Sequence, residues 1–227
     1  LRKQDAPSEE FVGYLKQLVN CVKDEPGLVG YYLADEPEIN DARSAYLEAM
    51  YRLMQELDPY HPVMITNDTL DGIVTHGYRA CDIINPDPYS PAWDYVPNFL
   101  KRCHEVAGPD KAIMLTLWHS STQAHFSNPW GTAPAYPYRV MREQYLVGVA
   151  QGCRGYTAYT SCFFMPEVVL RYGLPPIWRE VRFLEPAMAH PLDKPQVTAS
   201  AEMSAWAGQA NGQLYLIVVN HSLLFSH

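Results

Sequence analysis

The sequence predicts an α/β fold, either an open doubly wound sheet or a (β/α)8 barrel. Segments with apolar residues at helical spacing alternate with short apolar runs along most of the 227 residues. These runs are continuously apolar, as expected for parallel strands that are covered on both faces. No GxGxxG sequence follows any of them, so a dinucleotide-binding fold has no support.

The first part of the chain contains two predicted helices and three predicted strands. Helices are expected over 8–24 and 41–58, and strands over 27–34, 61–68 and 81–89. Ser8 is suited to cap the first helix because acidic residues follow it. Only a short connection is expected between the second and third strands.

The second part continues the alternation of predicted helices and strands, and its sequence pattern changes after Pro191. Helices are expected over 92–108, 136–152 and 175–190, and strands over 111–121 and 153–161. Beyond Pro191, alternating residues surround Asn211-Gly212, which is a strong hairpin signal. We therefore predict a (β/α) domain over 1–191 and the start of a C-terminal β-domain over 192–227.

Composition excludes several classes of function. The net charge of −8 argues against a nucleic-acid partner, which favours a basic surface. No apolar run approaches the roughly 20 residues of a membrane span, and no signal peptide is recognisable. The five cysteines form no CxxC pair, which argues against a zinc site or a disulfide framework. The expected protein is globular, with no membrane or nucleic-acid partner.

Every predicted strand ends in polar or aromatic residues. The strand ends are Asp35-Glu36, Asn67-Asp68, Asn85-Pro86-Asp87-Pro88-Tyr89, Trp118-His119-Ser120 and Tyr159-Thr160-Ser161. In parallel α/β folds the active site lies beyond the carboxyl ends of the strands. These side chains are therefore expected on one rim.

Glu36 is the strongest catalytic candidate on this rim. A carboxylate at the mouth of an apolar pocket can have its pKa raised by desolvation, so that it acts as a general acid near neutral pH. Pro37 stops the strand and fixes the turn that follows. Glu38 is expected to be a solvated residue near the start of the next helix.

Three segments resemble clan A (β/α)8 glycoside hydrolases and related bacterial proteins. "YYLADEPE" is similar to the end of strand four in that superfamily, where the Glu of an Asn-Glu-Pro or Asp-Glu-Pro sequence is the acid/base. "DIINPDPY" resembles strand six of glycosidase-like bacterial proteins, and "GVAQGCRGYTAYTS" resembles their seventh helix and eighth strand. The resemblance implies strands four to eight of a TIM-type barrel, which matches the count of about five strands. It also implies Glu36 as the acid, and a missing N-terminal barrel half as a partner.

The sequence departs from that pattern at one important place. The family has a nucleophilic Glu at the end of strand seven, but here "IMLTLWHSS" carries no carboxylate. Glycoside hydrolysis normally requires two carboxylates. Asp87 is the first candidate for the second; Asp68, Glu167 or a residue of the missing half are the others.

The sequence thus predicts a glycoside hydrolase-like enzyme that acts on a carbohydrate with Glu36 and Asp87 as catalytic residues. Substrate contacts are expected from Asp35, Asn85, Tyr89, Trp118, His119 and Tyr159. No cofactor and no metal are expected, because no metal-binding motif occurs. The resemblance slightly favours a secreted or periplasmic location. The alternatives are a non-catalytic carbohydrate-binding barrel and, with less support, a lyase or isomerase that uses Glu36 as its base.

Overall fold

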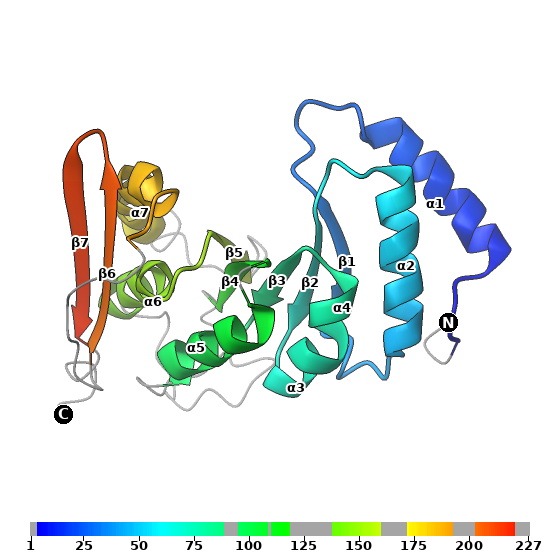
Figure 1. Ribbon diagram of the computed structural model, residues 1–227, viewed down its shortest axis with the longest axis horizontal. Coiled ribbons are helices and arrows are strands. Elements are labelled where there is room, and N and C mark those ends of the chain that lie inside the picture. Colours follow the sequence, from blue (N-terminus) through cyan, green and yellow to red (C-terminus); the bar gives the residue numbers. More distant parts are fainter. Residues whose placement is uncertain are drawn as a thin grey trace. The chain divides into compact units, whose positions relative to one another are not determined.

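The computed structural model describes residues 4–88, 95–108, 110–118, 138–159, 172–192 and 203–220 (Figure 1). The helices are α1 (Glu9–Val22), α2 (Ser44–Leu57), α3 (Leu70–Gly72), the π-helix η1 (Ile73–Gly77), α4 (Tyr78–Ala80), α5 (Tyr95–Ala107), α6 (Tyr138–Ala150) and α7 (Leu174–Met188). The strands are β1 (Tyr31–Asp35), β2 (Val63–Asn67), β3 (Ile83–Pro86), β4 (Ala112–Trp118), β5 (Gly155–Tyr159), β6 (Met203–Ala210) and β7 (Gln213–Asn220). The α/β class predicted from the sequence is confirmed.

Strands β1 to β5 form one sheet in sequential order. The pairs β1–β2, β2–β3 and β3–β4 are parallel. Sequential parallel order is that of a (β/α)8 barrel, of which five strands are a part. Residues of β2 and β3 are largely buried, as predicted, whereas the outer strands β1 and β5 are half-buried or exposed.

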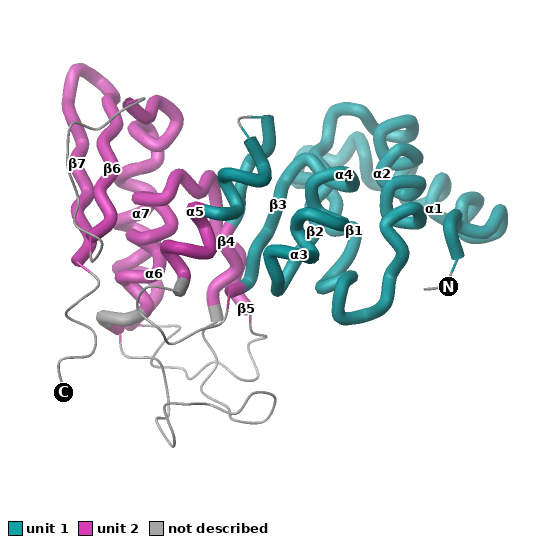
Figure 2. Tube along the Cα trace, turned by 60° about the horizontal axis from the view of Figure 1, so that its bottom comes forward, with its two compact units in different colours: residues 1–87, 102–114 teal, residues 88–101, 115–227 magenta. Residues whose placement is uncertain are grey.

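The chain divides into two compact units, each described by itself (Figure 2). Residues 1–87 and 102–114 form unit 1, and residues 88–101 and 115–227 form unit 2. In unit 1, helices α1 and α2 share an apolar cluster with β2. Its buried members are Leu15, Val19, Met50, Met54 and Val63. These residues recur at helical spacing on α1 and α2, which is why the sequence pattern located both helices.

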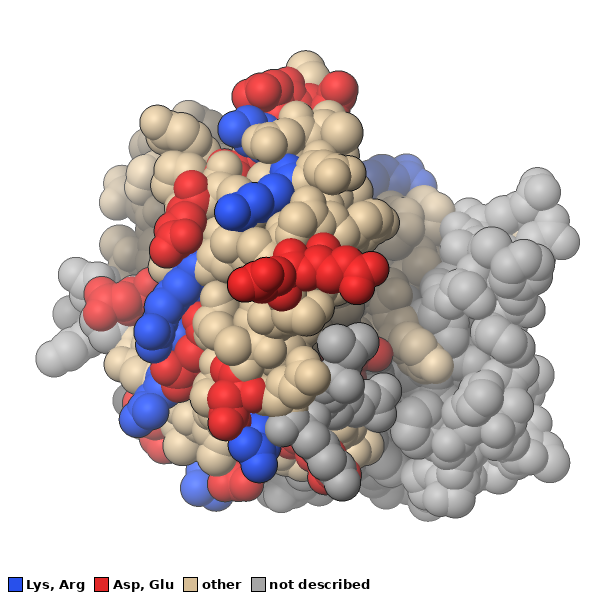
Figure 3. All heavy atoms as spheres, turned by 90° about the vertical axis from the view of Figure 1, so that its right-hand side faces the viewer, with Lys and Arg blue, Asp and Glu red and all other residues tan. Residues whose placement is uncertain are grey.

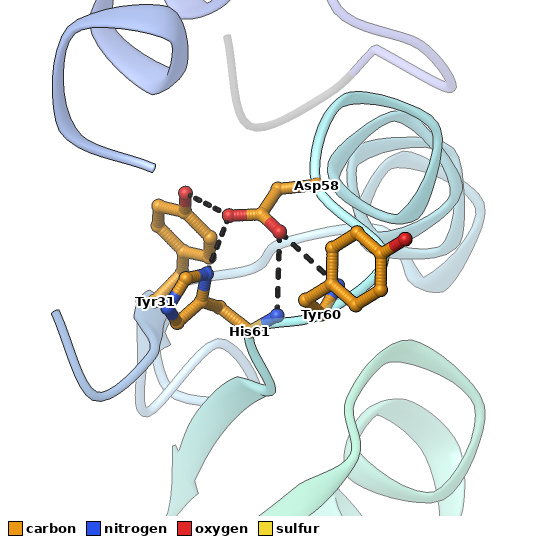
Figure 4. Close-up of polar contacts among 4 residues, drawn as sticks. All are labelled: Tyr31, Asp58, Tyr60 and His61. Carbon is orange, nitrogen blue, oxygen red and sulfur yellow. Dashed lines mark hydrogen bonds and ion pairs between the residues drawn. The ribbon is translucent and has the colours of Figure 1, made fainter. Parts of the chain in front are cut away.

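A buried aspartate fixes the turn between α2 and β2 (Figure 4). Asp58 is 4% exposed and accepts hydrogen bonds from the backbone N–H groups of Tyr60 and His61 at 3.1 and 3.4 Å. Its Oδ2 accepts from the Tyr31 hydroxyl and lies against His61 Nδ1, both at 2.7 Å. Burial alone would raise the pKa of Asp58, but the hydrogen bonds from Tyr31 and His61 outweigh it and lower the pKa to about 2. Asp58 thereby ties β1 to the entrance of β2.

The connection between β2 and β3 differs from the short link that the sequence predicts. Residues 70–80 form a continuous helical stretch, α3, η1 and α4, with a π-helical turn in its middle. Gly72 and Gly77 lower the helix propensity of this segment, so the sequence pattern did not predict a helix here. A Cβ at Gly72 would lie 2.3 Å from the Glu38 side chain and one at Gly77 would lie 2.6 Å from Asn67 Oδ1, so a larger residue at either position would displace these side chains.

In unit 2 the predicted hairpin is present. Strands β6 and β7 are antiparallel, and Ala210 pairs with Gln213 across Asn211-Gly212. Both turn residues have positive φ, 52° and 72°, as a type I′ turn requires. The hairpin packs on α6 and α7, and Gln151 Nε2 donates to Ser204 Oγ at 2.8 Å. The domain boundary at residue 191 stays a prediction. Strands β6 and β7 belong to the same compact unit as helices α6 and α7.

Acidic and basic side chains are interspersed on the face that Figure 3 shows. Ion pairs on the surface of unit 1 include Arg43–Asp5 at 2.7 Å and Arg52–Glu48 at 3.2 Å. Exposed pairs of this kind contribute little to stability. Among the described residues, no helix combines the length and the apolar character needed to cross a lipid bilayer.

Candidate functional site

Three carboxylates from three strand ends converge in unit 1. Glu36 follows β1, Asp68 follows β2 and Asp87 follows β3. One carboxylate oxygen from each lies within 4.8 Å of the others. We call these three residues the carboxylate cluster. The prediction that these strand ends share one rim is therefore confirmed for β1, β2 and β3.

The backbone holds Glu36 in an unusual conformation. Its φ is 41°, in the left-handed region that costs a residue with a Cβ about 1 kcal/mol. Its N–H donates to Thr66 O at 3.0 Å, and its carbonyl accepts from Asn40 Nδ2 at 3.1 Å. The buried Pro37 follows directly. The parallel pairing with β2 thus continues one residue beyond β1, and the side chain is directed by a turn that neighbouring groups hold in place.

Asp87 is the buried member of the cluster. It lies between Pro86 and Pro88, its N–H donates to Asn67 O at 3.2 Å, and it is 2% exposed. Its Oδ1 accepts no hydrogen bond from any N–H or hydroxyl group of the described residues. Its carboxyl group lies close to that of Glu36, with one oxygen of each within 4.8 Å of the other.

Burial and mutual repulsion raise the pKa values within the cluster. Burial raises the pKa of Asp87 most, and the negative charge of Glu36 raises it further. Burial also raises the pKa of Glu36, while the hydrogen bond with Asp87 opposes that rise. The pKa of Asp68 is raised by burial and by Glu38. The raised pKa values therefore favour retention of a proton by the pair of Glu36 and Asp87, most strongly on the buried Asp87.

A chain of hydrogen bonds connects four neighbouring strands of this rim. The Tyr32 hydroxyl lies 2.5 Å from Asp35 Oδ1 and 2.8 Å from Thr66 Oγ1. Thr66 Oγ1 donates to Asn85 Oδ1 at 2.7 Å, and Asn85 Nδ2 donates to Met114 O at 2.6 Å. Burial, followed by the hydrogen bond to Asp35, raises the pKa of Tyr32. This chain fixes the side chain of Asp35, and sequence reasoning missed the parts that Tyr32 and Thr66 take in it.

The side chains of Asn85 and Glu38 form hydrogen bonds with neighbouring residues of the rim. Asn85 is 1% exposed and uses both ends of its amide within the chain of hydrogen bonds, so the described geometry gives it a positioning part in the rim. The expectation that Glu38 is solvated is wrong. Glu38 is half-buried, and its carboxylate accepts from Asn67 Nδ2 at 2.8 Å and from Thr69 N at 3.1 Å. It holds the start of α3 against the end of β2, beside Gly72.

The other predicted substrate contacts stay predictions. Tyr89 and His119 lie outside the described residues, as does Glu167. For Trp118, the last residue of β4, only the backbone is described. Tyr159 ends β5 in unit 2 and is 43% exposed.

Substitution of Asp87 by asparagine is expected to stabilise the protein at alkaline pH. The folded-state pKa of Asp87 lies above its ordinary value of 3.8, so the folded state binds more protons and loses stability as pH rises above about 4. Asparagine resembles the protonated acid and avoids this loss. We expect Asp87→Asn to gain at least about 1 kcal/mol at pH 8 and almost nothing at pH 4, measured by urea denaturation.

The exposed Asp41, changed to asparagine, is the matched control and should show no such pH-dependent gain. An equal effect of Asp87→Asn at both pH values would contradict the raised pKa.

Comparisons with known proteins complete the description of the site. No protein-family model and no curated protein matches the sequence. Among solved structures, the chain is similar to a candidate beta-galactosidase from Bacteroides fragilis, with 16% identity, a TM-score of 0.45, and coverage of 65% of this chain and 24% of that one. It is also similar to alpha-L-fucosidase isoenzyme 1 from Paenibacillus thiaminolyticus, with 12% identity, a TM-score of 0.43, and coverage of 92% and 50%. The chain thus spans between a quarter and a half of the length of these two structures.

Proposed function

We propose that this chain carries the acid-catalytic rim of a glycoside hydrolase-like enzyme, with Glu36 as the general acid. The observation that carries the proposal is that carboxylate oxygens of Glu36 and Asp87, at the ends of parallel strands, lie within 4.8 Å of each other. A pair of this kind holds one proton near neutral pH because two adjacent negative charges repel each other. Catalysis of glycoside cleavage requires such a proton for the leaving oxygen.

The two residues have unequal parts in this proposal. Asp87 is almost fully buried, whereas Glu36 is half-buried and lies nearer to solvent. Glu36 would donate the proton to the glycosidic oxygen as the bond from that oxygen to the anomeric carbon breaks. The proton held by the pair would pass from Asp87 to Glu36 in the same step, and a proton from water would replace it after the sugar leaves. Glu36 is thus the catalytic residue and Asp87 a positioning residue.

This assignment differs from the expectation that Asp87 is the opposing carboxylate. Opposing carboxyl groups stand about 5–5.5 Å apart in retaining enzymes and about 6.5–9.5 Å apart in inverting ones. One carboxylate oxygen of Glu36 and one of Asp87 lie within 4.8 Å of each other, which is shorter than either separation. A sugar ring has no room between them. The proposal therefore assigns the attack on the anomeric carbon to a group other than Asp87.

A carbohydrate-binding barrel without catalysis is the second candidate. The observation that favours it is the end of β4, which reaches Trp118 without any carboxylate among the described residues of the strand. Aromatic faces and hydrogen-bonding groups on a rim are sufficient to hold a sugar. In that case the acidic pair would affect affinity rather than turnover.

A panel of 4-nitrophenyl glycosides, with different sugars and both anomers, separates the two candidates. A hydrolase releases nitrophenol from at least one member, and in ¹⁸O-labelled water the sugar product gains the heavy isotope. A binding protein shows saturable sugar affinity by calorimetry without release of nitrophenol. Release of nitrophenol without the heavy isotope in the sugar product would indicate elimination by a lyase and would contradict both candidates.

A further inference from the structure

The carboxylate cluster has no counter-charge in the part of the chain that the structure describes. Ion pairs among the described residues join Arg43, Arg52, Arg79, His61 and Arg142 to acidic residues, and none of them involves the cluster. Asp35 and Glu38 add further negative charge near Glu36. Three carboxylates at this spacing are stable together only when protons or a cation reduce their repulsion.

A second observation concerns Asp87 alone. This side chain is 2% exposed, and no N–H or hydroxyl group of the described residues donates to its Oδ1. A buried carboxylate oxygen without such donors is costly, and buried charges in proteins are paired or bind metals. Asp87 contributes an oxygen to the group that converges within 4.8 Å. The buried carboxyl group of Asp87 is therefore itself a member of the carboxylate cluster.

The spacing of the oxygens selects the kind of cation. Carboxylates are hard ligands that suit calcium, magnesium and manganese. Calcium binds oxygens at about 2.3–2.6 Å, so two of its ligands can lie at most about 4.6–5.2 Å apart. Magnesium, at about 2.0–2.1 Å, allows at most about 4.2 Å. The oxygens of the cluster lie within 4.8 Å of one another, a separation that the calcium shell accommodates.

We propose that Glu36, Asp68 and Asp87 bind one calcium ion at the ends of β1, β2 and β3. Each residue supplies one carboxylate oxygen, and water completes the shell. No motif in the sequence indicates this site, because its ligands come from three separate strand ends. The inference rests on the cluster and goes beyond the proposed hydrolysis. One consequence connects the two: a calcium ion would occupy the oxygens that otherwise hold the transferable proton, so saturating calcium is expected to suppress acid catalysis.

The test is calorimetric titration of calcium chloride into the chain 1–227, freed of metal with a chelator. We expect one ion per chain and a dissociation constant below about 1 mM, the weakest range of protein calcium sites. Asp68→Asn should weaken calcium binding at least tenfold, because it removes one of three ligands. Both residues of the proposed acid pair are kept in this variant. Asp71→Asn changes an exposed carboxylate three residues away and should bind calcium as the wild type does.

Thermal melts in chelator show whether each variant is folded, and calcium should raise the melting temperature of the wild type but hardly that of Asp68→Asn. No saturable binding at about 10 mM calcium would overturn the proposal. Binding that Asp68→Asn leaves unchanged would place the ion elsewhere and would overturn it equally. Because binding is measured directly, a chain that binds calcium without cleaving any glycoside contradicts only the proposed function, and the reverse result contradicts only the calcium site.

Discussion

Replacement of Glu36 by glutamine is expected to lower kcat/KM for an alkyl or 4-methoxyphenyl glycoside by about 10²–10⁴-fold, the usual contribution of a general acid. Glutamine keeps the size of the side chain and cannot transfer a proton to the leaving oxygen. A 2,4-dinitrophenyl glycoside needs little protonation at its leaving oxygen, so its cleavage should fall much less. This dependence on the leaving group separates a lost acid from general damage to the site.

The matched control for this variant is Asp41→Asn. Asp41 is an exposed carboxylate five residues away that also has positive φ, 53°, and asparagine tolerates that conformation. Its activity should stay at the wild-type level. If Glu36→Gln slows all leaving groups equally, Glu36 does not act as the acid. If sugar affinity is retained and the wild type itself shows no turnover, the carbohydrate-binding candidate is favoured.

The fold could be predicted from the sequence where the pattern is local. The apolar periodicity of α1 and α2 and the Asn211-Gly212 turn depend on residues close in sequence, and the structure confirms them. The helical stretch 70–80 could not be predicted in this way. Its glycines are poor helix formers, and contacts with Glu38 and Asn67, which lie in other segments, hold its backbone.

The candidate site shows the same division. That Glu36 and Asp87 follow strands is visible in the sequence, and parallel pairing brings such residues to one rim. Their separation of 4.8 Å or less was not predictable, because it depends on the register of three strands and on the left-handed turn at Glu36. The role of Asp87 as the second carboxylate stays a prediction, and the structure adds that an oxygen of Asp87 lies within 4.8 Å of one of Glu36.

Positioning of the rim also depends on residues that carry no catalytic signal. Thr66 is an ordinary strand residue by its pattern, yet it connects Tyr32 to Asn85 through its hydroxyl. A polar side chain within an apolar strand is the signal that could have identified it, since a buried hydroxyl needs a partner. Thr66 lies between β1 and β3 in the sheet order, so its bonds relate the positions of the two strands that precede Glu36 and Asp87.

Asp58→Ala is expected to destabilise the protein by about 3 kcal/mol at neutral pH. The change removes the acceptor for the Tyr31 hydroxyl, the His61 ring and two backbone N–H groups, and each buried donor left without a partner costs about 1–3 kcal/mol. Figure 4 shows the hydrogen bonds from these groups meeting on the Asp58 carboxylate. For a chain of this length the loss corresponds to a fall of about 6–12 °C in melting temperature.

The pH dependence of this loss identifies its electrostatic part. Because the folded-state pKa of Asp58 is about 2, below its ordinary 3.8, its contribution is complete above about pH 4 and is lost as pH falls toward 2. The difference in stability between the wild type and Asp58→Ala, measured by urea denaturation, should therefore shrink over that interval. Glu56→Ala, an exposed acidic residue at the end of the same helix, is the control and should change stability by less than about 0.5 kcal/mol. A difference that is constant from pH 2 to pH 7 would mean that Asp58 acts by filling space, and its charge would then have no part in holding β1 to the start of β2.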